Sequence, residues 1–309
     1  MDNYELRRDE VFSIMERPVH FESKGKNIFA IFRPAVNNAK KVGVIFLNAG
    51  FQYRVGPHRI YIKTARRLSQ IGFPSLSMDF SGLGDSEGEI RDIHFDCYDV
   101  EDALRAVDFL AQQEKIGKVV LLGLCAGARN AIKAAARDTR IDSIILWSLP
   151  FYAIPNSPTG KRYPQSLRRT DVKHYLGQRV KKALNIRLLI KYFSGYEKLA
   201  SIKDIFRDLV VGVKNGNNNN MHREFFEAFE LFLSSKRKAF FVYGERDDNF
   251  KKMFEEKFEE LSDDERRVCE YYIVPNGDHT FASVEAEKTV IEKTAEWLVQ
   301  QYGLKITKD

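Results

Sequence analysis

One cysteine of this chain lies in a setting that suits nucleophilic chemistry. Cys125 is flanked by Gly123 and Gly127, after the apolar run VVLL and before the helical run AGARNAIKAAA. A nucleophile elbow needs such a strand, tight turn and helix, and the positive amino end of a helix favours the reactive thiolate. We therefore predict that Cys125 is a nucleophile; the alternative is a buried cysteine that fills a strand–helix turn.

A histidine and an aspartate follow in the order that accompanies such an elbow, with the acid first and the base last. His279 is the only histidine after residue 222, and it lies in the loop PNGDHT after the apolar run YYIV. Asp247 follows the run AFFVY, with Asp248 as the neighbouring candidate. We predict that His279 is the base and that Asp247 orients it. The alternative is a loop histidine that caps the next helix.

Two backbone N–H groups are needed to stabilise the oxyanion of a tetrahedral intermediate. One is expected from Ala126, the residue after the nucleophile. The other is expected from the loop after the apolar run VGVIFL, at Phe51, because Gly50 permits a turn just before it.

The same loop continues into a basic segment, QYRVGPHR, at residues 52–59. Arg54 and His58, with Arg59 beside them, are candidates for binding an anionic part of the substrate. The alternative is a helix cap with solvated charges.

Strand and helix patterns alternate along most of the chain, which predicts a mostly parallel sheet with helices on both faces. The rhythm breaks after residue 150 and returns at residue 238. We therefore predict a core built from residues 1–150 and 238–309, interrupted by a helical insert at 151–237 that acts as a lid. The predicted core strands are 42–47, 74–80, 118–122, 141–147, 239–243 and 269–274.

The predicted insert is strongly basic. Residues 151–238 hold 18 Lys or Arg against 7 Asp or Glu, a net charge of +11 where the whole chain carries +6. Such a surface attracts anions, although a solvated helical face would have the same composition. No nucleic-acid-binding motif accompanies the charge, so nucleic acid is not an expected partner.

The remaining cysteines, Cys97 and Cys269, have no elbow around them and are expected to be packing residues. An odd cysteine count argues against a disulfide framework. We expect a cytoplasmic protein with no membrane span, because the amino-terminal segment is charged and no apolar run reaches about 18 residues. No cofactor or metal is expected, because the chain has no phosphate loop, dinucleotide fingerprint or metal-ligand cluster.

Several segments together resemble the α/β-hydrolase superfamily. They are NAGFQYRVGPHR at 48–59, MDFSGLGDSEG at 78–88, GLCAGA at 123–128 and DHTF at 278–281. The chain is most similar in them to the exosortase-associated hydrolase group. That resemblance implies an α/β-hydrolase fold and a hydrolase or acyltransferase activity with a cysteine nucleophile. Dienelactone hydrolases also place a cysteine in this elbow.

The predicted chemistry is acyl transfer through an S-acyl enzyme intermediate, ending on water or on another acceptor. A cysteine nucleophile forms a thioester, which is close in energy to a thioester substrate. We therefore expect an ester or acyl thioester substrate, linked to CoA or carried on an acyl carrier protein. The alternatives are a small-molecule carboxylesterase or lactone hydrolase, and a non-catalytic binding module on a hydrolase scaffold.

Overall fold

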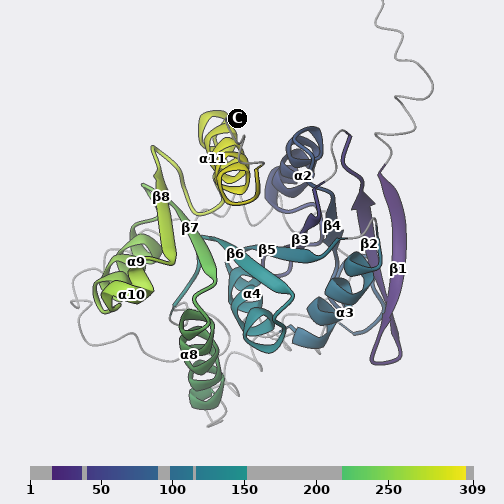
Figure 1. The fold of residues 1–309 in the computed structure, drawn as a ribbon, viewed down its shortest axis with the longest axis horizontal. Coiled ribbons are helices and arrows are strands. Elements are labelled where there is room, and N and C mark those ends of the chain that lie inside the picture. The colour runs from purple at the N-terminus through teal and green to yellow at the C-terminus, as the bar shows by residue number, and fades with distance from the viewer. Residues whose placement is uncertain (1–15, 37–39, 90–97, 114–115, 152–217, 304–309) are drawn as a thin grey trace, which may run out of the picture. The chain divides into compact units, whose positions relative to one another are not determined.

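A computed structural model of the chain describes residues 16–36, 40–89, 98–113, 116–151 and 218–303, without the side chains of 218–222. In these residues eight strands form one sheet in the order β1-β2-β4-β3-β5-β6-β7-β8 (Figure 1). β2 pairs antiparallel with β1 and with β4, and all other neighbours are parallel. The strands are β1 (Arg17–Ser23), β2 (Lys26–Arg33), β3 (Val42–Leu47), β4 (Ser75–Met78), β5 (Lys118–Leu124), β6 (Ile141–Trp147), β7 (Lys238–Gly244) and β8 (Cys269–Val274).

Helices cover both faces of this sheet, as predicted. Figure 1 shows α2 and α11 together on one face, with α3 and α4 on the other. The central strands β3 and β4 are buried along their whole length, which is typical of parallel strands covered on both faces. The helices are α2 (Ile60–Gln70), α3 (Val100–Ala111), α4 (Ala126–Arg137), α8 (Asn218–Ser234), α9 (Asp248–Glu259), α10 (Asp263–Arg266) and α11 (Val284–Tyr302), and η1 (Pro57–Arg59) is a short 3₁₀ turn.

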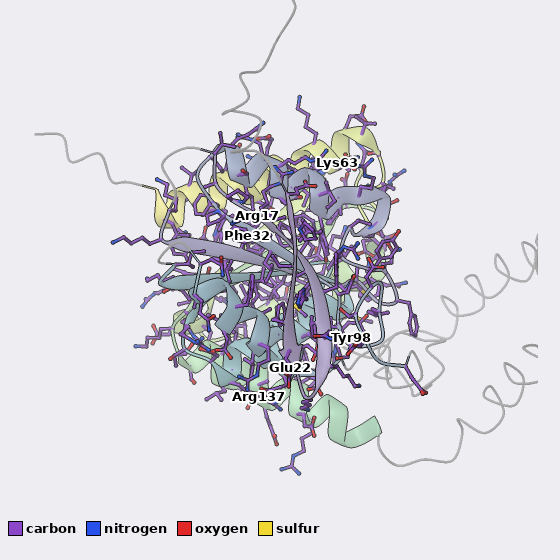
Figure 2. All side chains as sticks on the ribbon, turned by 90° about the vertical axis from the view of Figure 1, so that its right-hand side faces the viewer. Arg17, Glu22, Phe32, Lys63, Tyr98 and Arg137 are labelled. Atoms are coloured by element: carbon purple, nitrogen blue, oxygen red, sulfur yellow. The ribbon has the colours of Figure 1, made fainter. Side chains whose placement is uncertain are left out.

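The β1–β2 hairpin forms one edge of the sheet, which faces the viewer in Figure 2. Its two-residue turn, Lys24–Gly25, has positive φ at both positions, as tight hairpin turns require. Arg17 at the start of β1 lies over the ring of Phe32 on β2, 4.9 Å from the ring centroid. The pair covers apolar surface at this edge.

The α-helix that follows the loop after β3 begins at Ile60. His58 and Arg59 have left-handed backbone angles, with φ of 39° and 67°, so the α-helix cannot extend through them. This local geometry was not visible in the spacing of apolar residues.

The described residues up to 151 and from Arg223 onward form a first compact unit, and residues 152–222 are assigned to a second. The predicted insert at 151–237 lies for the most part outside the described residues. From Arg223 onward, α8 belongs to the first unit, where Phe225 and Phe229 pack on Phe151. Within the described ranges, no helix combines the length and apolar character that crossing a membrane requires.

Arg237, just before β7, ties the end of α4 to the start of β6. Its Nη1 donates to the carbonyls of Asp138 (3.0 Å) and Ile141 (2.6 Å), and its Nη2 donates to that of Ala135 (2.6 Å). The guanidinium therefore satisfies the Ala135 carbonyl, which the helix end leaves without an intrahelical donor, and links it to the carbonyls of Asp138 and Ile141.

Replacing this side chain should destabilise the fold. Arg237→Ala should lower the free energy of unfolding by about 2–3 kcal/mol, because hydrogen bonds from charged donors are lost and partly buried carbonyls remain. Arg223→Ala is the matched control: its exposed ion pair with Glu227 should contribute less than about 0.5 kcal/mol. Urea unfolding measures both, and equal losses would contradict the assignment.

Candidate active site

The turn between β5 and α4 has the geometry of a nucleophile elbow. Cys125 has φ 56° and ψ −115°, a strained conformation for a residue with a side chain, and its backbone N–H donates to the Trp147 carbonyl at 2.9 Å. A Cβ atom on Gly123 would lie 2.2 Å from the Gly127 carbonyl carbon, and one on Gly127 would lie 2.4 Å from the Leu47 oxygen. Only glycine fits at either position.

The predicted acid and base lie side by side. Asp247 Oδ2 accepts a hydrogen bond from His279 Nδ1 at 2.8 Å. The loops that carry them approach closely: a Cβ on Gly244 would lie 2.4 Å from the Gly277 oxygen, and Arg246 N–H donates to that oxygen at 2.8 Å. Asp248, the competing candidate, begins α9 and is exposed. Asp247 is therefore the aspartate that contacts the histidine.

The charge state of His279 depends on Cys125, the predicted nucleophile, as well as on Asp247. Burial disfavours its charged form, but hydrogen bonds to Asp247 and to Cys125, together with the charges of both groups, raise the pKa of His279 to about 10. Phe250 of α9 packs on the imidazole, with ring centroids 4.6 Å apart. Asp247 thus contacts His279 directly, and the catalytic roles of Cys125, Asp247 and His279 stay a prediction.

Asp79, at the end of β4, organises the loop after β3. Its buried carboxylate accepts from the backbone N–H of Arg54 at 2.6 Å and from Asn48 Nδ2 at 3.3 Å. Asn48 Nδ2 also donates to the Gln52 carbonyl, and Asn48 Oδ1 accepts from Phe80 N–H, both at 2.9 Å. These bonds fix the segment that holds the predicted oxyanion donor.

The two predicted oxyanion donors lie on the loop after β3 and at the start of α4. Ala126 is the first residue of α4, where backbone N–H groups have no intrahelical acceptor. Phe51 follows Gly50, which has φ 55°, and its side chain is 51% exposed. The oxyanion role of both residues stays a prediction.

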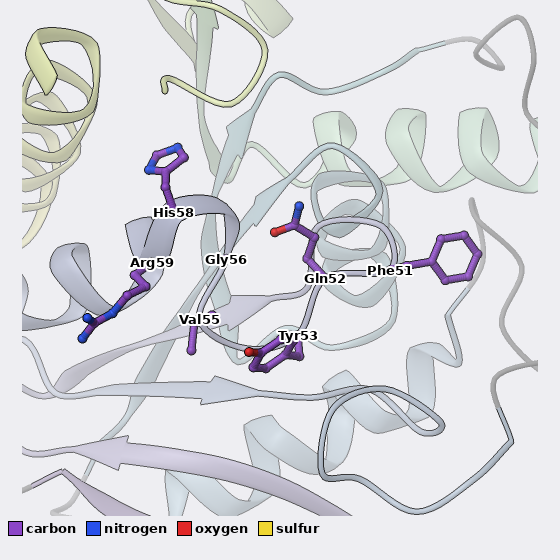
Figure 3. Close-up of a pocket in the computed structure, with 7 residues that line it drawn as sticks. All are labelled: Phe51, Gln52, Tyr53, Val55, Gly56, His58 and Arg59. Carbon is purple, nitrogen blue, oxygen red and sulfur yellow. The ribbon is translucent and has the colours of Figure 1, made fainter. Parts of the chain in front are cut away.

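A hollow of about 360 Å³ lies over this loop, lined by Phe51, Gln52, Tyr53, Val55, Gly56, His58 and Arg59 (Figure 3). The residues predicted to bind an anion have protein partners there. Arg54 forms ion pairs with Asp79 at 2.5 Å and Asp85 at 2.6 Å. His58 Nδ1 lies 2.7 Å from Glu287 Oε2, and its Nε2 lies 2.8 Å from the Thr280 carbonyl oxygen.

Four residues around the site were not among the predicted site residues: Asn48, Tyr61, Asp79 and Phe250. Tyr61 is fully buried beside the elbow: its hydroxyl donates to the Leu47 carbonyl and accepts from Leu124 N–H, both at 2.9 Å. The D-x-x-G-x-G pattern at Asp79 was a signal for that residue, but the pattern gave no role. Asn48, Tyr61 and Phe250 lie in segments whose pattern of apolar and polar residues predicts only buried core or loop and indicates no functional role.

Of the other two cysteines, the structure describes only Cys269. Burial raises the pKa of Cys269 to about 12, which leaves an unreactive thiol, and Cys97 lies outside the described residues. No group of three His, Cys, Asp or Glu side chains that could hold a metal ion occurs in the part of the chain that the structure describes.

Comparison with known proteins places these features in a family. A family model described as "Serine aminopeptidase, S33" (Hydrolase_4) matches residues 40–223, more than half of the chain. Over 82 residues the chain is 32% identical to the uncharacterized protein YcjY of Escherichia coli K12, covering 26% of this chain and 27% of that protein. It is 30% identical over 86 residues to the uncharacterized protein PA2218 of Pseudomonas aeruginosa, covering 26% and 22%. The matches thus span about a quarter of each relative.

Solved structures confirm the predicted α/β-hydrolase fold. Est1E of Butyrivibrio proteoclasticus with bound ferulic acid aligns with a TM-score of 0.59 at 16% identity, over 92% of this chain and 98% of that one. An esterase of Pyrococcus furiosus aligns with a TM-score of 0.60 at 18% identity, over 96% and 95%. A dienelactone hydrolase of Anabaena variabilis aligns with a TM-score of 0.57 at 15% identity, over 93% and 97%.

The coupling of His279 to Asp247 can be tested by titration. In the wild type His279 should remain protonated above its ordinary pKa of 6.5 and titrate near pH 10. Asp247→Asn removes the anionic partner and should lower the midpoint, whereas Asp248→Asn should leave it unchanged. NMR of histidine-labelled protein follows the imidazole signals directly. A wild-type midpoint near 6.5, or equal shifts in both variants, would contradict the coupling.

The raised pKa of His279 also makes the stability of the folded protein depend on pH. Folding raises the pKa of His279 from 6.5 to about 10, so protonation of this group stabilises the folded state fully below about pH 6.5. That contribution decreases as the pH rises toward about 10.

Proposed function

The chain belongs to the serine aminopeptidase S33 family of α/β hydrolases, and from that premise we propose that it is a cysteine acyl hydrolase or acyltransferase. Its substrate is an ester or an acyl thioester, and its reaction proceeds through an S-acyl enzyme intermediate on Cys125. The observation that carries the proposal is the hydrogen bond at 2.8 Å between His279 and Asp247, on a histidine whose pKa the elbow residue Cys125 also raises.

The first half of the reaction transfers the acyl group to the enzyme. The Cys125 thiolate attacks the acyl carbonyl carbon, and the carbonyl π electrons move to oxygen. The N–H groups of Ala126 and Phe51 would stabilise this oxyanion; losing one such donor typically slows an enzyme ~10²–10³-fold. When the intermediate collapses, the His279 imidazolium gives its proton to the departing thiolate or alkoxide. The product is an S-acyl thioester and neutral imidazole.

The second half releases the acyl group. Neutral His279 takes a proton from water or from another acceptor as its oxygen or nitrogen attacks the thioester carbon. Collapse of the second tetrahedral intermediate expels the Cys125 thiolate, and the imidazolium is restored. Asp247 keeps the charged imidazole in place in both halves and undergoes no net protonation.

The family is named for serine, whereas this chain carries Cys125 in the elbow. Transfer of an acyl group from a thioester donor to a cysteine is nearly balanced in free energy, because both species are thioesters. This supports a donor in which the acyl group is linked to CoA or to an acyl carrier protein. The basic composition of residues 151–238 suits such anionic carriers. The resemblance to the exosortase-associated hydrolases, which often have a cysteine nucleophile, supports the same assignment.

Intact-mass spectrometry tests the proposal. After incubation with a panel of acyl-CoA, acyl carrier protein thioesters and aryl esters, the wild type should gain the mass of one acyl group. Cys125→Ala should show no adduct and at least ~10³-fold lower turnover, because it removes the covalent route. Cys269→Ala, at the buried second cysteine, is the matched control and should keep both adduct and turnover.

The panel also separates the alternatives. Turnover of aryl esters with no reaction of any thioester would indicate a carboxylesterase or lactone hydrolase. An adduct that persists without turnover would indicate transfer to an acceptor absent from the assay. Turnover that survives in Cys125→Ala would refute the proposal, and binding of acyl compounds with neither adduct nor turnover would indicate a binding module.

A further inference from the structure

His58 connects the loop after β3 to the loop that carries His279. Figure 3 shows its ring turned away from the neighbouring Arg59 side chain. Its Nε2 lies 2.8 Å from the carbonyl oxygen of Thr280, the residue directly after His279. Its Nδ1 lies 2.7 Å from a carboxylate oxygen of Glu287, in the first turn of α11. Both ring nitrogens therefore contact groups from the carboxyl-terminal part of the chain.

Both partners of this imidazole are hydrogen-bond acceptors. A backbone carbonyl can only accept, and an ionised carboxylate can only accept. Burial opposes ionisation of Glu287, but hydrogen bonds from Lys63 and His58 outweigh it and hold the pKa of that carboxyl below its ordinary range. Lys63 Nζ lies 2.7 and 2.8 Å from the two oxygens of Glu287. Both ring nitrogens lie within hydrogen-bond distance of these acceptors, so the ring links the Thr280 peptide to the Glu287 carboxylate.

The backbone around His58 is held against its own preference. His58 and Arg59 are consecutive residues with positive φ, a region that residues with side chains seldom occupy. Such strain persists where surrounding contacts fix it, and it clusters at functional sites. The two bonds of His58 are contacts of this kind.

The Thr280 carbonyl belongs to a rigid turn beside the base. Asp278 Oδ1 accepts from the N–H groups of Thr280 at 3.1 Å and Ala282 at 2.9 Å. His279 is thus fixed at its ring by Asp247 and at the next peptide by His58. We propose that His58 is a positioning residue that holds the His279 loop in register with Cys125. This inference rests on the proposed role of His279 and replaces the expectation that His58 binds substrate.

Two replacements of His58 separate the contribution of its hydrogen-bond donors from that of its side-chain volume. His58→Gln keeps a polar side chain but offers one donor group and no charge. His58→Arg offers several donors, so it can contact both acceptors. His20→Gln, at an exposed position on β1, is the matched control. All four proteins are first compared by thermal unfolding, so that kinetics are read only on folded protein.

With an aryl ester or acyl thioester that the wild type turns over, His58→Gln should lower kcat about 10–100-fold, because a displaced base loses its near-attack geometry. KM should stay within about twofold. His58→Arg should recover most of the loss, and His20→Gln should match the wild type. An increase in KM at unchanged kcat would mean that His58 contacts substrate, and equal losses in His58→Gln and His58→Arg would mean that the hydrogen-bond donors do not matter. Either result overturns the inference.

A spectroscopic readout separates this inference from the proposed reaction. The proton shared by His279 and Asp247 should give a downfield NMR signal in the wild type, in His58→Arg and in His20→Gln. It should broaden or shift in His58→Gln. If the wild type turned over no acyl substrate while this pattern held, the proposed function would fail and the positioning role would stand. An unchanged signal in His58→Gln would overturn the positioning role, whatever the enzyme's activity.

Discussion

The site depends on a crossing of backbone where the end of β3 meets the first turn of α4. Gly127 has room for no side chain there, because a Cβ would lie 2.4 Å from the Leu47 oxygen and 2.6 Å from the Asn48 oxygen. This approach brings the strained turn at Cys125 beside the loop after β3. A parallel sheet presents the carboxyl ends of its strands at one edge, where ligands bind in such folds. The same constraint recurs at Gly244 against Gly277, and that contact brings the acid and base loops together.

Buried polar groups hold these loops once the glycines have let them approach. Tyr61 places its hydroxyl between Leu47 O and Leu124 N–H, so the two strand ends stay bonded where they diverge. Asp79 does the same for the loop after β3, with Arg54 compensating its buried charge. Buried polar groups that lack hydrogen-bond partners destabilise the fold, whereas buried groups whose hydrogen bonds are all formed favour a single arrangement of the loops. Polar pairs here therefore determine where backbone donors point.

The fold, the tight turn at Cys125 and the loops of Asp247 and His279 were accessible from sequence because each has a local signal. Apolar runs and glycine spacing mark β5, the elbow at Cys125 and the loop of His279. Tyr61 and Asn48 were not accessible, because their partners lie in strands distant along the chain. Arg54 shows the same limit: a basic residue beside a site predicts anion binding, but only its three-dimensional neighbours reveal that the anion is Asp79.

The charge state of His279 explains why a cysteine suits this elbow. A serine enzyme needs a neutral imidazole, because an alcohol gives up its proton only as it attacks. Here the contacts with Asp247 and Cys125 raise the pKa of His279 to about 10, so the imidazole carries its proton before substrate arrives. A thiol can supply that proton in advance, since free thiols ionise near pH ~8.5, whereas an alcohol cannot. In the proposed reaction, the proton that the leaving group needs is therefore already on His279.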